Sequence, residues 1–184
     1  MKYFTLFLLV LLAPINSNGQ GTGLEYSKEN EVEWNKDRKL TWEDFKGIPP
    51  SITETNASAN TNCGFDVSAE SNSSKELIAV RIKNIFYCDK SWVRIDKRDM
   101  TDLLEHEQAH FDLCEVYTRR LRKRVEDSNY KLDIDNAIFE VFEAFKKRQK
   151  LYDQETNHSR NKEKQVEWLN IIARELLELD NYSI

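Results

Sequence analysis

Two histidines that lie four residues apart on one face of a predicted helix constrain this chain more than any other feature of its sequence. Apolar residues recur at three- and four-residue spacing from about residue 99 to residue 125, which predicts an amphipathic helix. His106 and His110 lie inside this pattern, and Glu107 directly follows the first of them. Because residues four apart lie above one another on the same helix face, both imidazoles can reach one metal ion.

The H-E-x-x-H pattern also predicts a chemistry for the residue that follows the first histidine. Zinc binds imidazole nitrogen at roughly 2.0–2.1 Å, which two histidines one turn apart can meet without distortion of the backbone. Glu107 then lies beside the metal, where its carboxylate can take a proton from zinc-bound water instead of binding the ion. The pattern therefore predicts a zincin-like active-site helix and a hydrolase with Zn²⁺ as its cofactor.

A catalytic zinc site usually has a third protein ligand, and the sequence offers two kinds. His158 is the only other histidine in the chain, and it follows the second predicted helix in a polar segment that can fold over the first helix. His158 is therefore the favoured third ligand. The alternative is a carboxylate, either Glu140 or Glu143 on the second predicted helix, or Asp112 or Glu115 within a turn of the motif.

Composition limits the class of protein. The 184 residues carry 27 basic and 32 acidic side chains, and the formal net charge is -5. This balance argues against a nucleic-acid partner, because phosphate neutralisation needs a surplus of lysine and arginine. The length fits a single domain, which we expect to span residues 20–184.

Residues 1–19 are predicted to be a secretory signal peptide. Lys2 precedes an apolar run over residues 3–14, and Ser17 and Gly19 then place small residues before the expected cleavage site. The run is shorter than the roughly 20 apolar residues of a membrane-spanning helix, so no membrane anchor is expected after cleavage. We therefore expect an exported protein.

An exported chain meets an oxidising environment, where its three cysteines allow one disulfide bond. Cys63 and Cys88 both fall in the strand-rich part of the chain, so we favour this pair. Cys114 falls inside the helix pattern and is expected to be a buried apolar side chain, since Asp112 and Glu115 beside it would raise the pKa of its thiol.

The chain divides into a strand-rich part, residues 35–95, and a helical part, residues 99–180. Segments rich in Val, Ile and Phe at residues 61–68 and 77–86 predict antiparallel strands, and the alternating segment 40–45 predicts a further strand or a turn. The expected fold class is therefore α+β, with a small N-terminal antiparallel β-sheet followed by about three α-helices.

Apolar periodicity predicts two further helices after the one that carries the motif. They span about residues 134–151 and 161–179, and the polar segment 152–159 is predicted to link them. For the first helix, Asp99 or Thr101 is a suitable N-cap.

Four short motifs add a family resemblance. They are L-L-E-H-E-Q-A-H-F-D at residues 103–112, Y-D-x-x-T-x-H at 152–158, L-T-W-x-D-F-x-G at 40–47 and S-W-V at 91–93. Together they resemble the motifs of a bacterial family of predicted secreted zinc-dependent proteases, formerly a domain of unknown function. The resemblance implies a zinc-dependent protease that is periplasmic or secreted and acts on a peptide or protein substrate. That family usually has glycine after the Y-D-x-x-T-x-H motif, whereas this chain has Ser159, which does not favour the tight turn that glycine permits.

Analogy with zinc peptidases suggests roles for further residues. The phenol of Tyr152 is predicted to hydrogen-bond the oxyanion that develops as water attacks a carbonyl group, and the alternative is a packing tyrosine at a helix end. Asp153 or Asp112 is expected either to accept the free ring N–H of a ligand histidine or to be a solvated cap.

Two functions from different classes follow from these residues. The leading hypothesis is an exported zinc metallopeptidase with Glu107 and Tyr152 as catalytic residues and His106, His110 and His158 as metal ligands. The alternative is a non-catalytic exported zinc-binding or interaction protein whose metal only joins the helices. Neither the substrate nor the oligomeric state can be predicted from the sequence.

Overall fold

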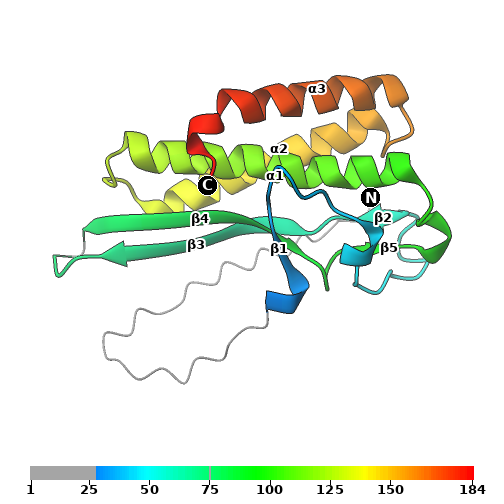
Figure 1. Ribbon diagram of the computed structural model, residues 1–184, viewed down its shortest axis with the longest axis horizontal. Coiled ribbons are helices and arrows are strands. Elements are labelled where there is room, and N and C mark those ends of the chain that lie inside the picture. Colours follow the sequence, from blue (N-terminus) through cyan, green and yellow to red (C-terminus); the bar gives the residue numbers. More distant parts are fainter. Residues whose placement is uncertain (1–27, 75) are drawn as a thin grey trace.

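Two small antiparallel sheets and three α-helices form the part of the chain that the structure, a computed structural model, describes: residues 28–74 and 76–184 (Figure 1). The strands come before the helices, so the predicted α+β class is confirmed. The predicted signal peptide, residues 1–19, lies outside the described residues. Within the described residues, no helix has both the length and the apolar character needed to cross a membrane.

The larger sheet has three strands in the order β1-β4-β3, and a second sheet pairs β2 with β5. The bounds are β1 (Glu31–Glu33), β2 (Ala59–Asn60), β3 (Cys63–Ser71), β4 (Leu77–Tyr87) and β5 (Trp92–Val93). Strands β3 and β4 form antiparallel pairs over the two segments predicted from their Val, Ile and Phe content. In β4, Ile82 and Phe86 point to the same face because side chains alternate along a strand, and both are buried.

The segment predicted as a strand or a turn forms a short 3₁₀-helix, η2 (Trp42–Asp44). Asp44 accounts for this, because its carboxylate accepts a hydrogen bond from the backbone N–H of Thr41 at 2.8 Å and caps the turn. Gly47 then passes very close to a neighbouring loop. A Cβ atom at this position would lie 2.8 Å from the backbone oxygen of Ser91, which accounts for glycine here.

All three predicted helices are present: α1 (Thr101–Asp127), α2 (Ile134–Thr156) and α3 (Lys162–Glu178). The end of α2 differs from the prediction, because the helix continues past residue 151 into the segment 152–159 that we expected to be a linker. Tyr152 and Asp153 therefore lie in the last turns of a helix, and their positions are fixed by its backbone.

The helix starts have different capping. The N-cap of α1 is Met100, not Asp99 or Thr101 as predicted, and it makes no side-chain capping hydrogen bond. In contrast, Asn161 caps α3 through its side-chain oxygen, which accepts a hydrogen bond from Lys164 N at 3.1 Å. The first turn of α3 is thus well fixed.

Helix α1 is the central element of the fold. It contacts β3 and β4 on one side and α2 and α3 on the other, so the helices cover one face of the larger sheet (Figure 1). Its burial extends around most of its circumference and includes polar side chains. Those of His106, Glu107 and His110 are among them. The H-E-x-x-H motif therefore lies in the interior, where uncompensated polar groups are costly.

The cysteines do not form the predicted pair, since Cys63, Cys88 and Cys114 are all buried and free. The thiol of Cys63 faces α1 and donates to the backbone oxygen of His110 at 3.8 Å, whereas Cys88 lies near Asp44 in the η2 segment. The two thiols thus face different neighbours. Burial raises the pKa of the Cys114 thiol, and the adjacent Cys63 raises it further, as expected for a buried apolar side chain.

Candidate metal centre

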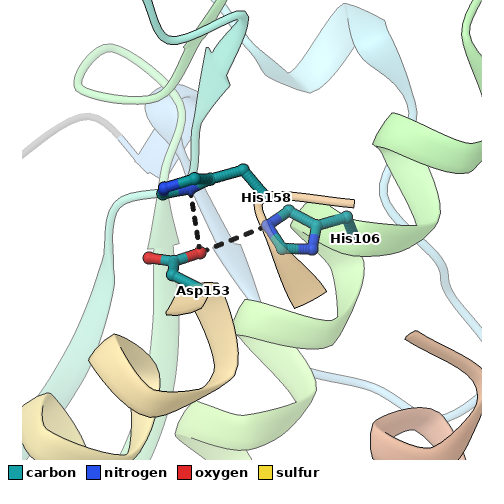
Figure 2. Close-up of side chains that lie close together, drawn as sticks. All are labelled: His106, Asp153 and His158. Carbon is teal, nitrogen blue, oxygen red and sulfur yellow. Dashed lines mark ion pairs between the residues drawn. The ribbon is translucent and has the colours of Figure 1, made fainter. Parts of the chain in front are cut away.

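Side chains from α1 and from the end of α2 converge beside the N-terminal half of α1. His106 and His110 project from α1, Asp153 from the last turn of α2, and His158 from the turn that follows. Figure 2 shows the Asp153 carboxylate joined by dashed ion pairs to the rings of His106 and His158. The ligand atoms of His106, Asp153 and His158 all lie within 4.8 Å of one another, so this group can hold a metal ion.

The distances between the donor atoms match those of one coordination sphere. The Nε2 atoms of His106 and His110 are 3.3 Å apart. Oδ1 of Asp153 lies 3.3 Å from the first and 3.0 Å from the second, and Nδ1 of His158 lies 3.5 Å from the same oxygen. Ligand atoms held at 2.0–2.1 Å by a tetrahedral ion lie about 3.3–3.4 Å apart. The donor atoms of His106, His110 and Asp153 therefore fit an ion of the size of zinc, and His158 Nδ1 lies near the same carboxylate oxygen.

The chemistry of the donors also fits a cation. The Nδ1 atom of each helix histidine contacts an amide oxygen, from Gln165 for His106 and from Gln149 for His110. Amide oxygens accept hydrogen bonds, so Nδ1 carries a proton and Nε2 faces Asp153. Two nitrogen lone pairs and a carboxylate oxygen at this spacing repel one another unless positive charge lies among them. A metal ion supplies that charge.

In the metal-free protein, protons supply the charge instead. Burial disfavours the charged form of His110, but the adjacent Asp153 outweighs burial and raises the pKa of His110 to about 9. Burial by itself would raise the pKa of Asp153, yet the facing His110 holds it well below its usual range. A hydrogen bond with Asp153 also raises the pKa of His158. Asp153 with His110 and His158 therefore favours bound positive charge.

Glu107 lies next to this cluster and is only 4% exposed. Its negative charge helps to raise the pKa of both His110 and Tyr152, which places the carboxylate near both rings. Among the described residues, that carboxylate takes part in no hydrogen bond or ion pair, while its backbone oxygen accepts from Thr61 at 3.1 Å. The buried side-chain atoms that lack a hydrogen-bond partner among the described residues do not include the Glu107 oxygens, so the carboxylate reaches solvent at the site and is available for proton transfer.

Tyr152 supports the ring of His106. Their rings stack with centroids 4.7 Å apart and planes at 20°, and Tyr152 is fully buried. Its hydroxyl donates to the backbone oxygen of His106 at 3.3 Å and accepts from Gln165 at 2.7 Å. Burial raises the pKa of this phenol. These contacts favour the packing alternative, and the oxyanion role stays a prediction.

The other carboxylates considered as ligands lie in other networks. Glu140 pairs with Arg124, and Glu143 pairs with Lys146. Asp112 accepts hydrogen bonds from Trp34 and Gln108, and Glu115 pairs with two arginines of α1. The carboxylate at the centre is instead Asp153, which the sequence suggested only as a partner for a ring N–H or as a cap.

The turn after α2 has an uncommon backbone. Asn157, His158 and Ser159 have φ values of 48°, 52° and 69°, so three consecutive residues are left-handed. This conformation costs a residue other than glycine roughly 1–2 kcal/mol, and asparagine tolerates it best. The turn closes with a hydrogen bond from His158 N to the Asp153 carbonyl oxygen at 3.0 Å. It thereby brings the His158 ring back to Asp153, although the side chain is 67% exposed.

Ser159 occupies the position where the resembling family has glycine, and we predict that Ser159→Gly stabilises the protein. Relief of the left-handed strain outweighs the greater freedom of glycine in the unfolded chain, for a net gain of about 0.5–1 kcal/mol. Urea unfolding of the metal-free protein measures this. Asn157→Gly is the matched control, with a smaller gain because asparagine already tolerates the conformation. A Ser159→Gly protein less stable than wild type contradicts the prediction.

Comparison with known proteins places this site inside a matched family segment. Residues 88–159 match the model of a family described as a bacterial protein of unknown function (DUF922). The matched segment contains all four donors of the cluster and Glu107, and it ends at Ser159. The description gives no activity. No curated protein and no solved structure matches the chain.

Proposed function

We propose that the protein is an exported zinc-dependent hydrolase that cleaves peptides or proteins, in the periplasm or outside the cell. The observation that carries the proposal is Glu107, whose carboxylate has no hydrogen-bond or ion-pair partner among the described residues and lies beside the convergent ligand atoms of His106, His110 and Asp153. A carboxylate that is free of protein partners beside a metal site can act as a general base. The family resemblance of the surrounding motifs supports peptide bonds as the substrate.

In this proposal His106, His110 and Asp153 hold the ion. Asp153 is preferred to His158 as the third ligand because its Oδ1 atom lies within 3.3 Å of both Nε2 atoms. The side chain of Asp153 is 31% exposed and that of His158 is 67% exposed, so Asp153 is the better fixed of the two. His158 then lies on the solvent side of the site, beside the position left for substrate.

The catalytic step assigned to the chain is proton transfer by Glu107. Zinc, when bound, lowers the pKa of a coordinated water and polarises a carbonyl group. Glu107 accepts a proton from the attacking water and delivers it to the leaving amine nitrogen, as a general base and then a general acid. Its carboxylate is free for both tasks because no described side chain pairs with it.

Peptide hydrolysis by the zinc-loaded protein tests the proposal. Incubation with a broad peptide library, followed by mass spectrometry of the products, is expected to give new termini that disappear when a chelator is added. A protein that binds zinc stoichiometrically but cleaves no peptide in the library contradicts the peptidase assignment.

A non-catalytic zinc protein is the second candidate, and one observation favours it. His158 offers a fourth donor, and a tetrahedral site with four protein ligands is closed to substrate. Chelation separates the candidates. A closed structural site is expected to lose helicity and thermal stability together with the metal, whereas an open catalytic site loses hydrolysis while the helices persist.

A further inference from the structure

We propose that Gln165 is a positioning residue that holds the His106 ring with its proton on Nδ1 and its Nε2 lone pair directed at the metal. The inference rests on the metal site of the proposed function. Gln165 lies on α3, beyond the segment that matches the family model, and no sequence motif identified it. Among the described residues, its side chain is hydrogen-bonded to His106 and to Tyr152.

The contacts form a closed ring of hydrogen bonds with one possible direction. The backbone oxygen of His106 can only accept, so the Tyr152 hydroxyl donates to it at 3.3 Å. That hydroxyl therefore accepts from Nε2 of Gln165 at 2.7 Å. Oε1 of Gln165 is then the atom that faces His106 Nδ1 at 3.0 Å, and Nδ1 must donate to it. The backbone carbonyl group of His106 thus sets, through Tyr152 and Gln165, which nitrogen of the His106 ring carries the proton.

Burial removes water as an alternative partner in these hydrogen bonds. Gln165 is 3% exposed, His106 is 2% exposed and Tyr152 has no exposed surface, so bulk water does not replace any of the three partners. Loss of the Gln165 amide would leave the ring N–H unpaired in the interior, which is costly. The His106 imidazole would then rotate, or its proton would move from Nδ1 to Nε2, to recover a hydrogen-bond partner. Either change takes the Nε2 lone pair away from Asp153.

The backbone at the start of α3 fixes Gln165 in this place. Asn161 N donates to the Thr156 carbonyl oxygen at 2.8 Å, and Gln165 N donates to the Asn161 carbonyl oxygen at 2.9 Å. The short turn between α2 and α3 therefore couples Gln165 rigidly to the helix end that carries Asp153. Gln149 has the same arrangement for His110, because its Oε1 atom contacts Nδ1 of that ring.

The test compares Gln165→Leu, Gln165→Glu and wild type. Leucine keeps the volume and removes the acceptor, so zinc affinity, measured by competition with a chromogenic chelator, is expected to fall about 10- to 100-fold. Glutamate retains an oxygen that accepts the His106 N–H but cannot donate to the Tyr152 hydroxyl, so it is expected to restore much of the affinity that Gln165→Leu loses. Gln154→Leu is the matched control, because Gln154 is an exposed glutamine in the last turn of α2. It should bind zinc as wild type does.

A second measurement reads the proton position without any metal. Nitrogen NMR of the chelator-treated protein is expected to show the neutral His106 ring protonated on Nδ1 in wild type and Gln165→Glu, and on Nε2 or mixed in Gln165→Leu. A wild-type ring protonated on Nε2, or a Gln165→Leu protein with unchanged proton position and zinc affinity, overturns the inference. If no peptide is cleaved but the predicted shifts occur, the hydrolase proposal fails and the role of Gln165 stands.

Discussion

A Glu107→Gln protein is expected to bind zinc as tightly as wild type and to hydrolyse peptides roughly 10²- to 10⁴-fold more slowly, the usual contribution of a general base. Glutamine has the shape of glutamate but cannot accept the proton. Because the Glu107 carboxylate takes part in no hydrogen bond or ion pair among the described residues, the change breaks none and the fold is expected to persist. Metal content and initial rates on one cleaved peptide measure the two effects separately.

Glu105→Gln is the matched control for this variant. Glu105 lies two residues earlier on α1, carries the same charge and is exposed. It is expected to keep both zinc and activity. Equal activity of the Glu107 and Glu105 variants would falsify the assignment of Glu107 as the base, and loss of zinc from the Glu107 variant would make Glu107 a ligand instead.

Asp153→Ala is expected to weaken zinc binding by more than about 100-fold, which exceeds the usual effect of losing an outer partner of a ligand. His158→Ala is expected to weaken it by no more than about tenfold. The difference follows from geometry, because Asp153 Oδ1 lies within 3.3 Å of both helix histidines, while His158 is largely exposed and lies 3.5 Å from Asp153. Competition with a chelator of known affinity measures both variants.

The opposite order of effects restores His158 as the third ligand, as the sequence suggested. Asp153 would then accept the free ring N–H of His158 and orient it. Equal and large losses in both variants would mean that all four donors bind, which is the closed site of the non-catalytic candidate. Each of the three outcomes therefore assigns one coordination set.

Much of the fold could be predicted because its signals are local. The apolar repeat of α1 and the Val and Ile residues of β4 are such local signals, and both elements appear close to their predicted bounds. The three-residue strand β1 was missed, because one apolar side chain, Val32, gives no period. The prediction of a disulfide bond between Cys63 and Cys88 was wrong, because the presence of both residues in strand-rich segments does not show which way their thiols face. Cys63 faces α1, and Cys88 does not share that neighbour.

The site was predictable only in part, since its remaining residues come from elements brought together by packing. His106, Glu107 and His110 form a motif with its own spacing, whereas Asp153 and Gln149 are recognisable only once α2 is known to continue to Thr156. They are then four residues apart on one helix face, which is a usable signal. Gln165 lies on the same face of α3 as the buried Trp168 and Ile172. Because it is polar, the apolar periodicity that predicts α3 does not mark it as a buried residue.

Zinc content per chain, in wild type beside His106→Ala, tests the central claim most directly. Both proteins are purified without chelator, equilibrated with zinc, desalted and measured by elemental analysis. We predict one zinc ion per wild-type chain and none in the variant, because His106 Nε2 lies within 3.3 Å of two other donor atoms of the site. A wild-type protein without zinc, or a His106→Ala protein that keeps a full equivalent, contradicts the metal site and the function built on it.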